Sequence, residues 1–126
     1  MDKFATAITC IDGRIPQPVS DWVKLQFNVH YVDLITEPGP DKVLSDGDEN
    51  VIGWIVARVK FSLEHHHSEV VILSGHGTCA ANPVPKEEHY KQIVHGAERL
   101  LSYDMPATII GIWVNESGSV DLVWDS

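Results

Sequence analysis

Cysteine and positive charge are both scarce in this chain. The 126 residues include only two cysteines, too few for the disulfide framework on which small secreted domains depend. Nine Lys and Arg stand against 18 Asp and Glu, which gives a net charge of −9. Such an excess of negative charge argues against nucleic acid or an anionic membrane surface as the partner.

Long apolar runs are also missing. The longest, such as VVIL and ATIIGIWV, fall far short of the ~20 residues that a membrane-spanning helix needs. Residues 1–10 lack the apolar core and cleavage site of a signal peptide. We therefore expect a cytoplasmic protein, in which two cysteines more often bind a metal or act in catalysis than form a disulfide.

The composition that is present is that of an ordinary globular protein. Hydrophobic residues make up 44% and charged residues 21% of the sequence, and no repeat, linker or low-complexity tract divides it. A chain of this length suffices for one hydrophobic core. We therefore expect residues 1–126 to form a single domain.

Hydrophobic periodicity predicts alternating strands and helices. Ser20 is the expected N-cap of the first helix, and Leu101 is expected to face inward near the end of the third. The stretch 36–47, rich in Pro, Gly and Asp, is expected to be a loop. The order is typical of a three-layer α/β fold, with a mostly parallel central sheet, flanking helices and an antiparallel edge strand. The expected strands are 3–9, 29–35, 69–74, 107–114 and 120–124, and the expected helices are 20–27, 49–64 and 87–102.

Two of the expected strands are followed by residues of the types that commonly bind metals. Cys10 follows the first strand, and His76 and Cys79 follow the strand at 69–74. The carboxyl ends of parallel strands line the ligand crevice of an open sheet, so these side chains are expected to meet there. Two thiols and an imidazole suit Zn²⁺ and leave a fourth tetrahedral position open, as in catalytic zinc sites.

A carboxylate and a guanidinium accompany the first of these strand ends. Asp12 and Arg14 lie two residues apart, just after Cys10. A paired carboxylate and guanidinium beside a metal can orient a metal-bound water. The same two residues could instead form an ion pair that only stabilises the turn.

Two short motifs resemble the signature of β-class carbonic anhydrases. Residues 10–14 read CIDGR and residues 76–79 read HGTC, matching C-x-D-x-R and H-x-x-C. The resemblance extends over most of the chain and implies a short, divergent member of that family. It implies a homodimer or larger homo-oligomer. It also implies an enzyme in which zinc-bound hydroxide reversibly hydrates carbon dioxide to bicarbonate, or hydrolyses a related small substrate such as COS or CS₂.

The resemblance also assigns roles to individual residues. It implies that Cys10, His76 and Cys79 hold Zn²⁺, that Asp12 positions the nucleophile, and that Arg14 orients Asp12. In some members of the family the aspartate moves onto the metal as a fourth ligand and closes the site, and the sequence leaves both states open.

The chain departs from the family pattern in three places, and the first two departures favour an alternative function. We expect no N-terminal helical arm, and the stretch 34–39 lacks the Arg that usually ends the second strand. Ala80 stands where the family has Gly after the second Cys. The alternative is a non-catalytic zinc-binding or regulatory protein that retains the metal motif.

Other interpretations of the two thiols stay open at this point. They could be inert core residues, could hold iron or cobalt in place of zinc, or could form a disulfide in oxidised, metal-free protein. A thiol-redox role is a weaker alternative, because the C-x-x-C arrangement that tunes such pairs is missing.

The remaining histidines are expected to be structural. His65, His66 and His67 are expected at the C-terminal end of the second helix, where they would suit the helix dipole. His89 and His95 are expected to face solvent on the third helix. None of them is identified as a proton shuttle.

Overall fold

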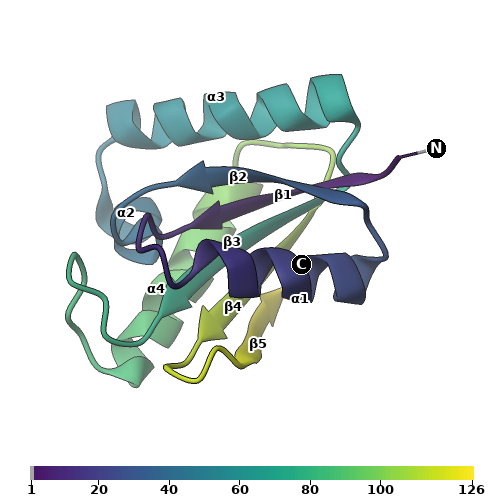
Figure 1. Ribbon diagram of the computed structural model, residues 1–126. Helices are drawn as coiled ribbons and strands as arrows, with labels where there is room; N and C mark the ends of the chain where they lie inside the picture. Colours follow the sequence, from purple (N-terminus) through teal and green to yellow (C-terminus); the bar gives the residue numbers. More distant parts are fainter. Residues whose placement is uncertain (1) are drawn as a thin grey trace.

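A five-stranded sheet forms the centre of the computed structural model, which describes residues 2–126 (Figure 1). The strand order is β2-β1-β3-β4-β5. β1 pairs in parallel with β2 and β3, β3 pairs in parallel with β4, and β5 is antiparallel to β4. The strands are β1 (Phe4–Thr9), β2 (Tyr31–Thr36), β3 (Val70–His76), β4 (Thr108–Val114) and β5 (Val120–Asp125), and the helices are α1 (Pro16–Phe27), α2 (Pro40–Asp46), α3 (Glu49–His66) and α4 (Lys86–Leu101).

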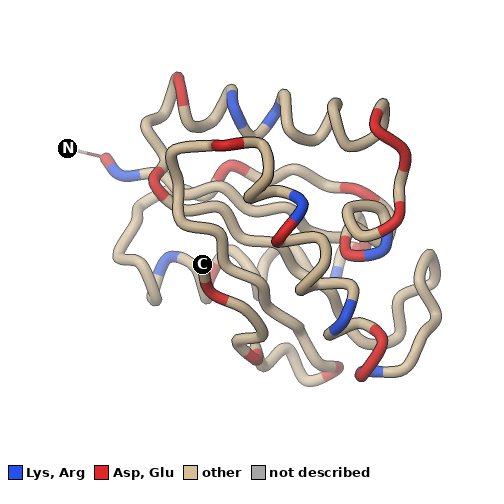
Figure 2. Tube along the Cα trace, turned by 180° about the vertical axis from the view of Figure 1, so that it is seen from behind, with Lys and Arg blue, Asp and Glu red and all other residues tan. Residues whose placement is uncertain are grey.

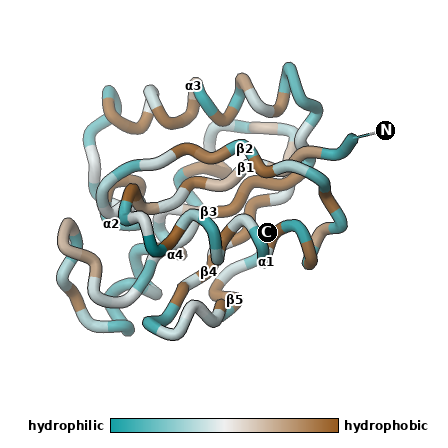
Figure 3. Tube along the Cα trace, in the orientation of Figure 1, coloured by the Kyte–Doolittle hydropathy of each residue, from teal (hydrophilic) through white to brown (hydrophobic). Residues whose placement is uncertain are grey.

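Helices cover both faces of the sheet and bury two apolar clusters against it. One cluster joins residues of β1, β3 and β4, among them Ile8 and Leu73, to the inner sides of α2, α3 and α4. The other joins the opposite face of the sheet to α1 through Val19 and Val23. Apolar residues accordingly gather along the central strands (Figure 3). This arrangement confirms the three-layer, mostly parallel α/β fold with one antiparallel edge strand.

The sheet has its topological switch point between β1 and β3. The chain leaves β1 for β2 on one side and then returns through α2 and α3 to β3 on the other side. The carboxyl ends of β1 and β3 therefore lie side by side, with Ile8 paired to Leu73. Open α/β sheets bind ligands at this position.

Two of the helices differ from the sequence prediction because proline is tolerated in a first helical turn. α1 begins at Pro16, with Ile15 as its N-cap, so the assignment of Ser20 as the cap was wrong. α2 begins at Pro40 inside a stretch predicted to be a loop. A proline in the first turn lacks only an N–H that the helix leaves unpaired in any case.

The other elements follow the prediction within a few residues. α3 begins after Asp48, whose side chain accepts a hydrogen bond from the Val51 backbone N–H at 3.0 Å. Leu101 was predicted to face inward and is instead 45% exposed, because Leu100 takes the buried position at this end of α4 and the next residue is turned away from it by about 100°.

The surface agrees with the negative charge of the sequence. Lys and Arg are scattered among Asp and Glu along the chain, without a basic face in the part that the structure describes (Figure 2). Among residues 2–126, no helix is long and apolar enough to cross a bilayer.

Candidate metal centre

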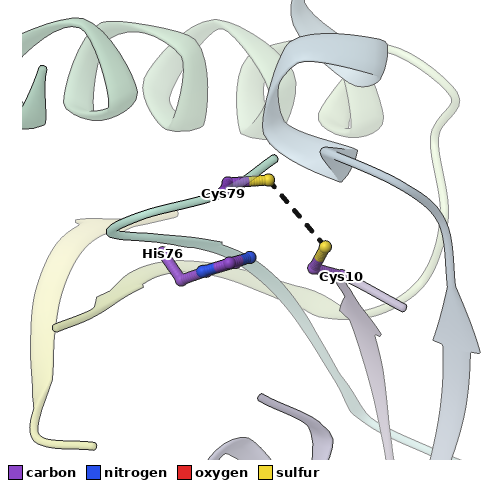
Figure 4. Close-up of side chains that lie close together, drawn as sticks. All are labelled: Cys10, His76 and Cys79. Atoms are coloured by element: carbon purple, nitrogen blue, oxygen red, sulfur yellow. Dashed lines mark hydrogen bonds between the residues drawn. The ribbon is translucent and has the colours of Figure 1, made fainter. Parts of the chain in front are cut away.

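Cys10, His76 and Cys79 meet at the switch point of the sheet (Figure 4). Cys10 is the first residue after β1, His76 is the last residue of β3, and Cys79 lies in the turn that follows. Their potential ligand atoms all lie within 4.8 Å of one another, and all three residues are buried. The two sulfurs are 3.9 Å apart, and both cysteines are free.

The separation of the two sulfurs fits a shared tetrahedral metal. Two sulfurs bound at ~2.3 Å to a tetrahedral Zn²⁺ lie about 3.8 Å apart, close to the 3.9 Å between Cys10 Sγ and Cys79 Sγ. A disulfide would instead require about 2.05 Å between the sulfurs. The geometry therefore matches two thiolates on one metal and does not match a disulfide.

The imidazole of His76 is held with one nitrogen free. Its Nδ1 donates to the backbone carbonyl of Gly77 at 2.8 Å, because a carbonyl oxygen can only accept. This hydrogen bond leaves a lone pair on Nε2, which is buried and has no hydrogen-bond partner. A buried nitrogen without a partner is unfavourable, and a metal ion would satisfy it in the way usual for metal-binding histidines.

The environment of Cys79 favours the protonated thiol when no cation is bound. Burial raises the pKa of Cys79, and the neighbouring Cys10 raises it further. A bound metal reverses this effect because its positive charge favours the thiolate. The donor set therefore fits a cation such as Zn²⁺ and is unfavourable for two thiolates without one.

Asp12 and Arg14 lie beside the cluster as a close ion pair. Arg14 Nε donates to Asp12 Oδ1 at 3.0 Å, and Nη2 donates to Oδ2 at 2.5 Å. These hydrogen bonds hold the pKa of the Asp12 carboxyl well below its usual range. Arg14 also reaches the Thr78 carbonyl at 3.4 Å, so the pair links the end of β1 to the turn that carries Cys79.

The turn between His76 and Cys79 has a restricted shape. Thr78 adopts a φ of 55°, a region that β-branched residues rarely occupy, so the turn stores some strain. Gly77 packs against the Trp113 ring, where an added Cβ would lie only 3.3 Å from a ring carbon. Both features fix the position of Cys79 relative to β3.

A buried polar cluster, not predicted from the sequence, supports the same turn. The Asn82 backbone N–H donates to the Cys79 carbonyl at 3.2 Å. The Asn82 side chain donates to Asp41 Oδ1 at 3.2 Å and to Gln92 Oε1 at 2.6 Å, and His89 Nδ1 lies 2.6 Å from Asp41 Oδ2. The cluster therefore connects α2 and α4 to the turn that carries Cys79.

The expectation that His89 faces solvent was wrong, since the residue is only 1% exposed. A signal for its burial was present in the sequence, because His89 precedes the inward Ile93 by one helical turn and so shares its face. Asp41 gave no comparable signal, because it lay in a stretch taken as a loop. His95 is exposed, as expected.

The three consecutive histidines do not join the metal centre. His65 and His66 occupy the last turn of α3, and His67 is its C-cap, as predicted. His66 Nδ1 pairs with Asp33 at 2.6 Å. Within residues 2–126, the Cys10, His76 and Cys79 cluster is the group whose ligand atoms converge.

The stretch 34–39, which lacks the Arg usual in the family, ends at Gly39. Gly39 packs against Ala81 and Asn82, which follow Cys79. Gly39 is the N-cap of α2 with a φ of 58°. An added Cβ at Gly39 would lie 3.2 Å from Asn82 Cβ, so the two loops are closely packed.

Comparisons with known proteins agree with the fold and the cluster. Residues 1–124 match the model of the family described as "Putative carbonic anhydrase". No curated protein matches the sequence.

Solved structures of β-carbonic anhydrases are similar to the chain in fold. Isoform I from Trichomonas vaginalis has a TM-score of 0.66 at 14% identity, over 95% of this chain and 82% of that one. One of two tetrameric enzymes from Sordaria macrospora has a TM-score of 0.63 at 13% identity, over 99% of this chain and 82% of that one. CafA from Aspergillus fumigatus has a TM-score of 0.59 at 12% identity, over 96% of this chain and 74% of that one.

At these identities the solved structures show a shared fold, while the family model matches nearly the whole sequence. The fold, the converging cluster and the family match agree with one another. The chain therefore belongs to the carbonic anhydrase family that this model describes.

Proposed function

We propose that this protein is a zinc-dependent carbonic anhydrase that converts carbon dioxide and bicarbonate into each other. Cys10, His76 and Cys79 would hold the zinc. The observation that carries the proposal is the unpartnered, buried Nε2 of His76, together with two thiols at the separation that a tetrahedral zinc requires. Three protein ligands leave the fourth position for water and substrate.

Zinc in this set would supply a Lewis acid that lowers the pKa of water toward neutrality. Asp12 would accept a hydrogen bond from the attacking water, which directs a lone pair of the water oxygen toward the substrate carbon. Arg14 holds Asp12 in place through two parallel hydrogen bonds and keeps the carboxylate ionised. The pairing with Arg14 supports the open state of the site, in which Asp12 does not occupy the fourth position.

The same arrangement suits other small linear electrophiles. COS and CS₂ offer an electrophilic carbon of similar size to that of carbon dioxide, and the proposal extends to their hydrolysis. The alternative of a non-catalytic zinc-binding protein draws support from the missing Arg in the stretch 34–39. The Asp12–Arg14 pair opposes it, because a closed structural site has no need of a group that orients water.

We further propose a single cytoplasmic domain that assembles as a homodimer or larger homo-oligomer. The edge strand β2 supports association, because Tyr31 and Leu34 on it are 50% and 43% exposed and unpaired strand edges tend to find partners. A solved structure of similar fold is described as tetrameric.

The test is carbon dioxide hydration by stopped flow, across neutral and mildly alkaline pH, with zinc measured in the same samples. We expect about one zinc per chain, and a loss of at least ~100-fold in turnover for Asp12→Asn with zinc retained. Asp21→Asn, an exposed aspartate on α1, serves as the matched control and should leave turnover unchanged. Full zinc without hydration at any pH would redirect the assay to COS and CS₂, and inactivity there would favour the non-catalytic function.

A further inference from the structure

The two cysteines of the chain lie in contact with each other. Cys10 Sγ and Cys79 Sγ are 3.9 Å apart, within hydrogen-bonding distance for sulfur (Figure 4), and both thiols are free. The sequence contains no third cysteine. Within one chain, each thiol therefore has the other as its one possible disulfide partner, and that partner is already beside it.

A disulfide between these two residues requires only a small movement. The sulfurs must approach each other from 3.9 Å to about 2.05 Å, a change of about 1.9 Å. Rotation about the Cα–Cβ bonds of two cysteines supplies a movement of this size. Residues 77–85, which carry Cys79, lie outside the helices and strands, so an adjustment around Cys79 leaves the sheet and α4 intact.

Both thiols are buried but are next in sequence to exposed residues. Cys10 and Cys79 are each 3% exposed, whereas Ile11 is 61% exposed. Thr78 and Ala80, on either side of Cys79, are exposed as well. Local opening of a surface turn costs much less free energy than global unfolding, so a small oxidant such as hydrogen peroxide can reach the sulfurs in the folded protein.

The same two sulfurs supply two of the three protein ligands in the proposed zinc site. Cysteine binds a metal as the thiolate, and a disulfide sulfur carries no such negative charge. His76 would then be the one ligand left of the converging cluster, whereas zinc sites in proteins use three or four protein ligands. A disulfide between Cys10 and Cys79 is therefore incompatible with zinc at this site.

We propose that this site is also a redox switch, in which a peroxide joins Cys10 and Cys79 in a disulfide and so releases the zinc. The inference rests on the proposed zinc ligands but not on turnover. One thiolate attacks a peroxide oxygen, so that an S–O bond forms, the O–O bond breaks and hydroxide leaves. The second thiolate attacks the resulting sulfenic sulfur, so that the S–S bond forms and a second hydroxide leaves. Each sulfur loses one electron, and the peroxide takes up both.

The test exposes the reduced, zinc-loaded protein to hydrogen peroxide and follows zinc, free thiols and intact mass in the same samples. We expect release of the zinc to a chromophoric chelator in step with the loss of both thiols. The mass of the chain should fall by two hydrogens, and digestion should yield one peptide pair that links Cys10 to Cys79. A phosphine reductant should restore both thiols and zinc binding.

Cys10→Ser and Cys79→Ser are matched variants that each leave one thiol. Peroxide should convert that thiol to a sulfenic acid, which dimedone traps, without the loss of two hydrogens. Zinc that stays bound while the thiols are oxidised, sulfinic acids without a linked peptide pair, or a disulfide between two chains would overturn the proposal. Hydration by the reduced protein tests the proposed function separately, because a site that binds zinc without turnover would still be oxidised in this way.

Discussion

Arg14 binds the Asp12 carboxylate through two nitrogens, with Nε 3.0 Å from Oδ1 and Nη2 2.5 Å from Oδ2. Because Arg14 also donates to the Thr78 carbonyl, this pair positions the carboxylate relative to the turn that carries Cys79. In the proposed enzyme, this pair would keep Asp12 away from the zinc and directed toward the substrate.

Arg14→Gln should release Asp12 and lower the rate of carbon dioxide hydration by about tenfold or more, with zinc content unchanged. Losses of this size in activity are common when a residue that orients a group beside the metal is replaced. Stopped-flow assays with zinc analysis measure both quantities. Arg58→Gln is the control, since Arg58 is an exposed residue of α3 that donates to the Trp54 carbonyl. Full activity of Arg14→Gln would contradict the positioning role.

The ionisation of Asp12 should not contribute to pH effects in the neutral range. Hydrogen bonds from Arg14 lower the pKa of Asp12. A lowered pKa means that the pair stabilises the fold fully above the ordinary value near ~4 and is lost only as pH falls through the lowered value. A carbon-13 titration of the Asp12 carboxyl should show no change until pH is well below ~4, and a return toward the ordinary value in Arg14→Gln. A midpoint near ~4 in the unaltered protein would refute the pairing.

Zinc loading should release a proton from Cys79 and weaken as pH falls. Burial raises the pKa of this thiol in the metal-free protein, so it is protonated at neutral pH and must lose its proton to bind the metal. Affinity should therefore rise with pH up to the raised pKa. Calorimetry in buffers of different ionisation enthalpy counts the protons released. An affinity that does not change from acid to alkaline pH would show that Cys79 is not a ligand.

Asn82→Ala should weaken zinc binding by about tenfold or more, although Asn82 does not touch the metal. Its side chain connects the turn of Cys79 to Asp41 and Gln92, and removing it takes one hydrogen-bond donor from each of these buried groups. Competition with a chromophoric chelator measures the affinity. Asn50→Ala, on the exposed start of α3, should bind zinc as the unaltered chain does. Equal affinity in the two variants would argue against the support that we assign to Asn82.

Gly75→Ala should destabilise the protein by about 1–3 kcal/mol, because the added Cβ would lie 2.5 Å from Asp41 Oδ2. Gly53→Ala is the matched control, since no atom lies within 4 Å of its added Cβ. In a helix this change should stabilise by about 0.5–1 kcal/mol. Urea unfolding measures both. Equal effects in the two variants would show that the Asp41 carboxylate does not need the space at Gly75.

The sequence was sufficient to predict the layers of the fold and the meeting of Cys10 with His76 and Cys79. Alternation of β-branched runs and helical stripes defines an α/β sheet, and parallel strands bring their carboxyl ends together. Proline was the main source of error: the first helix was predicted from residue 20 but begins at Pro16, and the predicted loop 36–47 contains a helix that begins at Pro40.

The buried cluster around Asp41 was beyond sequence reasoning for a physical reason. Its members come from α2, the turn after β3 and α4, and charged or amide side chains are usually exposed. They are stable in the interior because Asn82 donates to both Asp41 and Gln92, and His89 Nδ1 donates to Asp41. That mutual satisfaction depends on tertiary packing, which no local pattern of residues encodes.

The most direct test of the central claim is X-ray absorption at the zinc edge on the reconstituted, reduced protein. The account predicts two sulfur ligands at ~2.3 Å and two nitrogen or oxygen ligands at ~2.0–2.1 Å, one of them exchangeable for azide. A site without sulfur, or one whose four ligands are unaffected by azide, would contradict the claim that Cys10, His76 and Cys79 form an open zinc site.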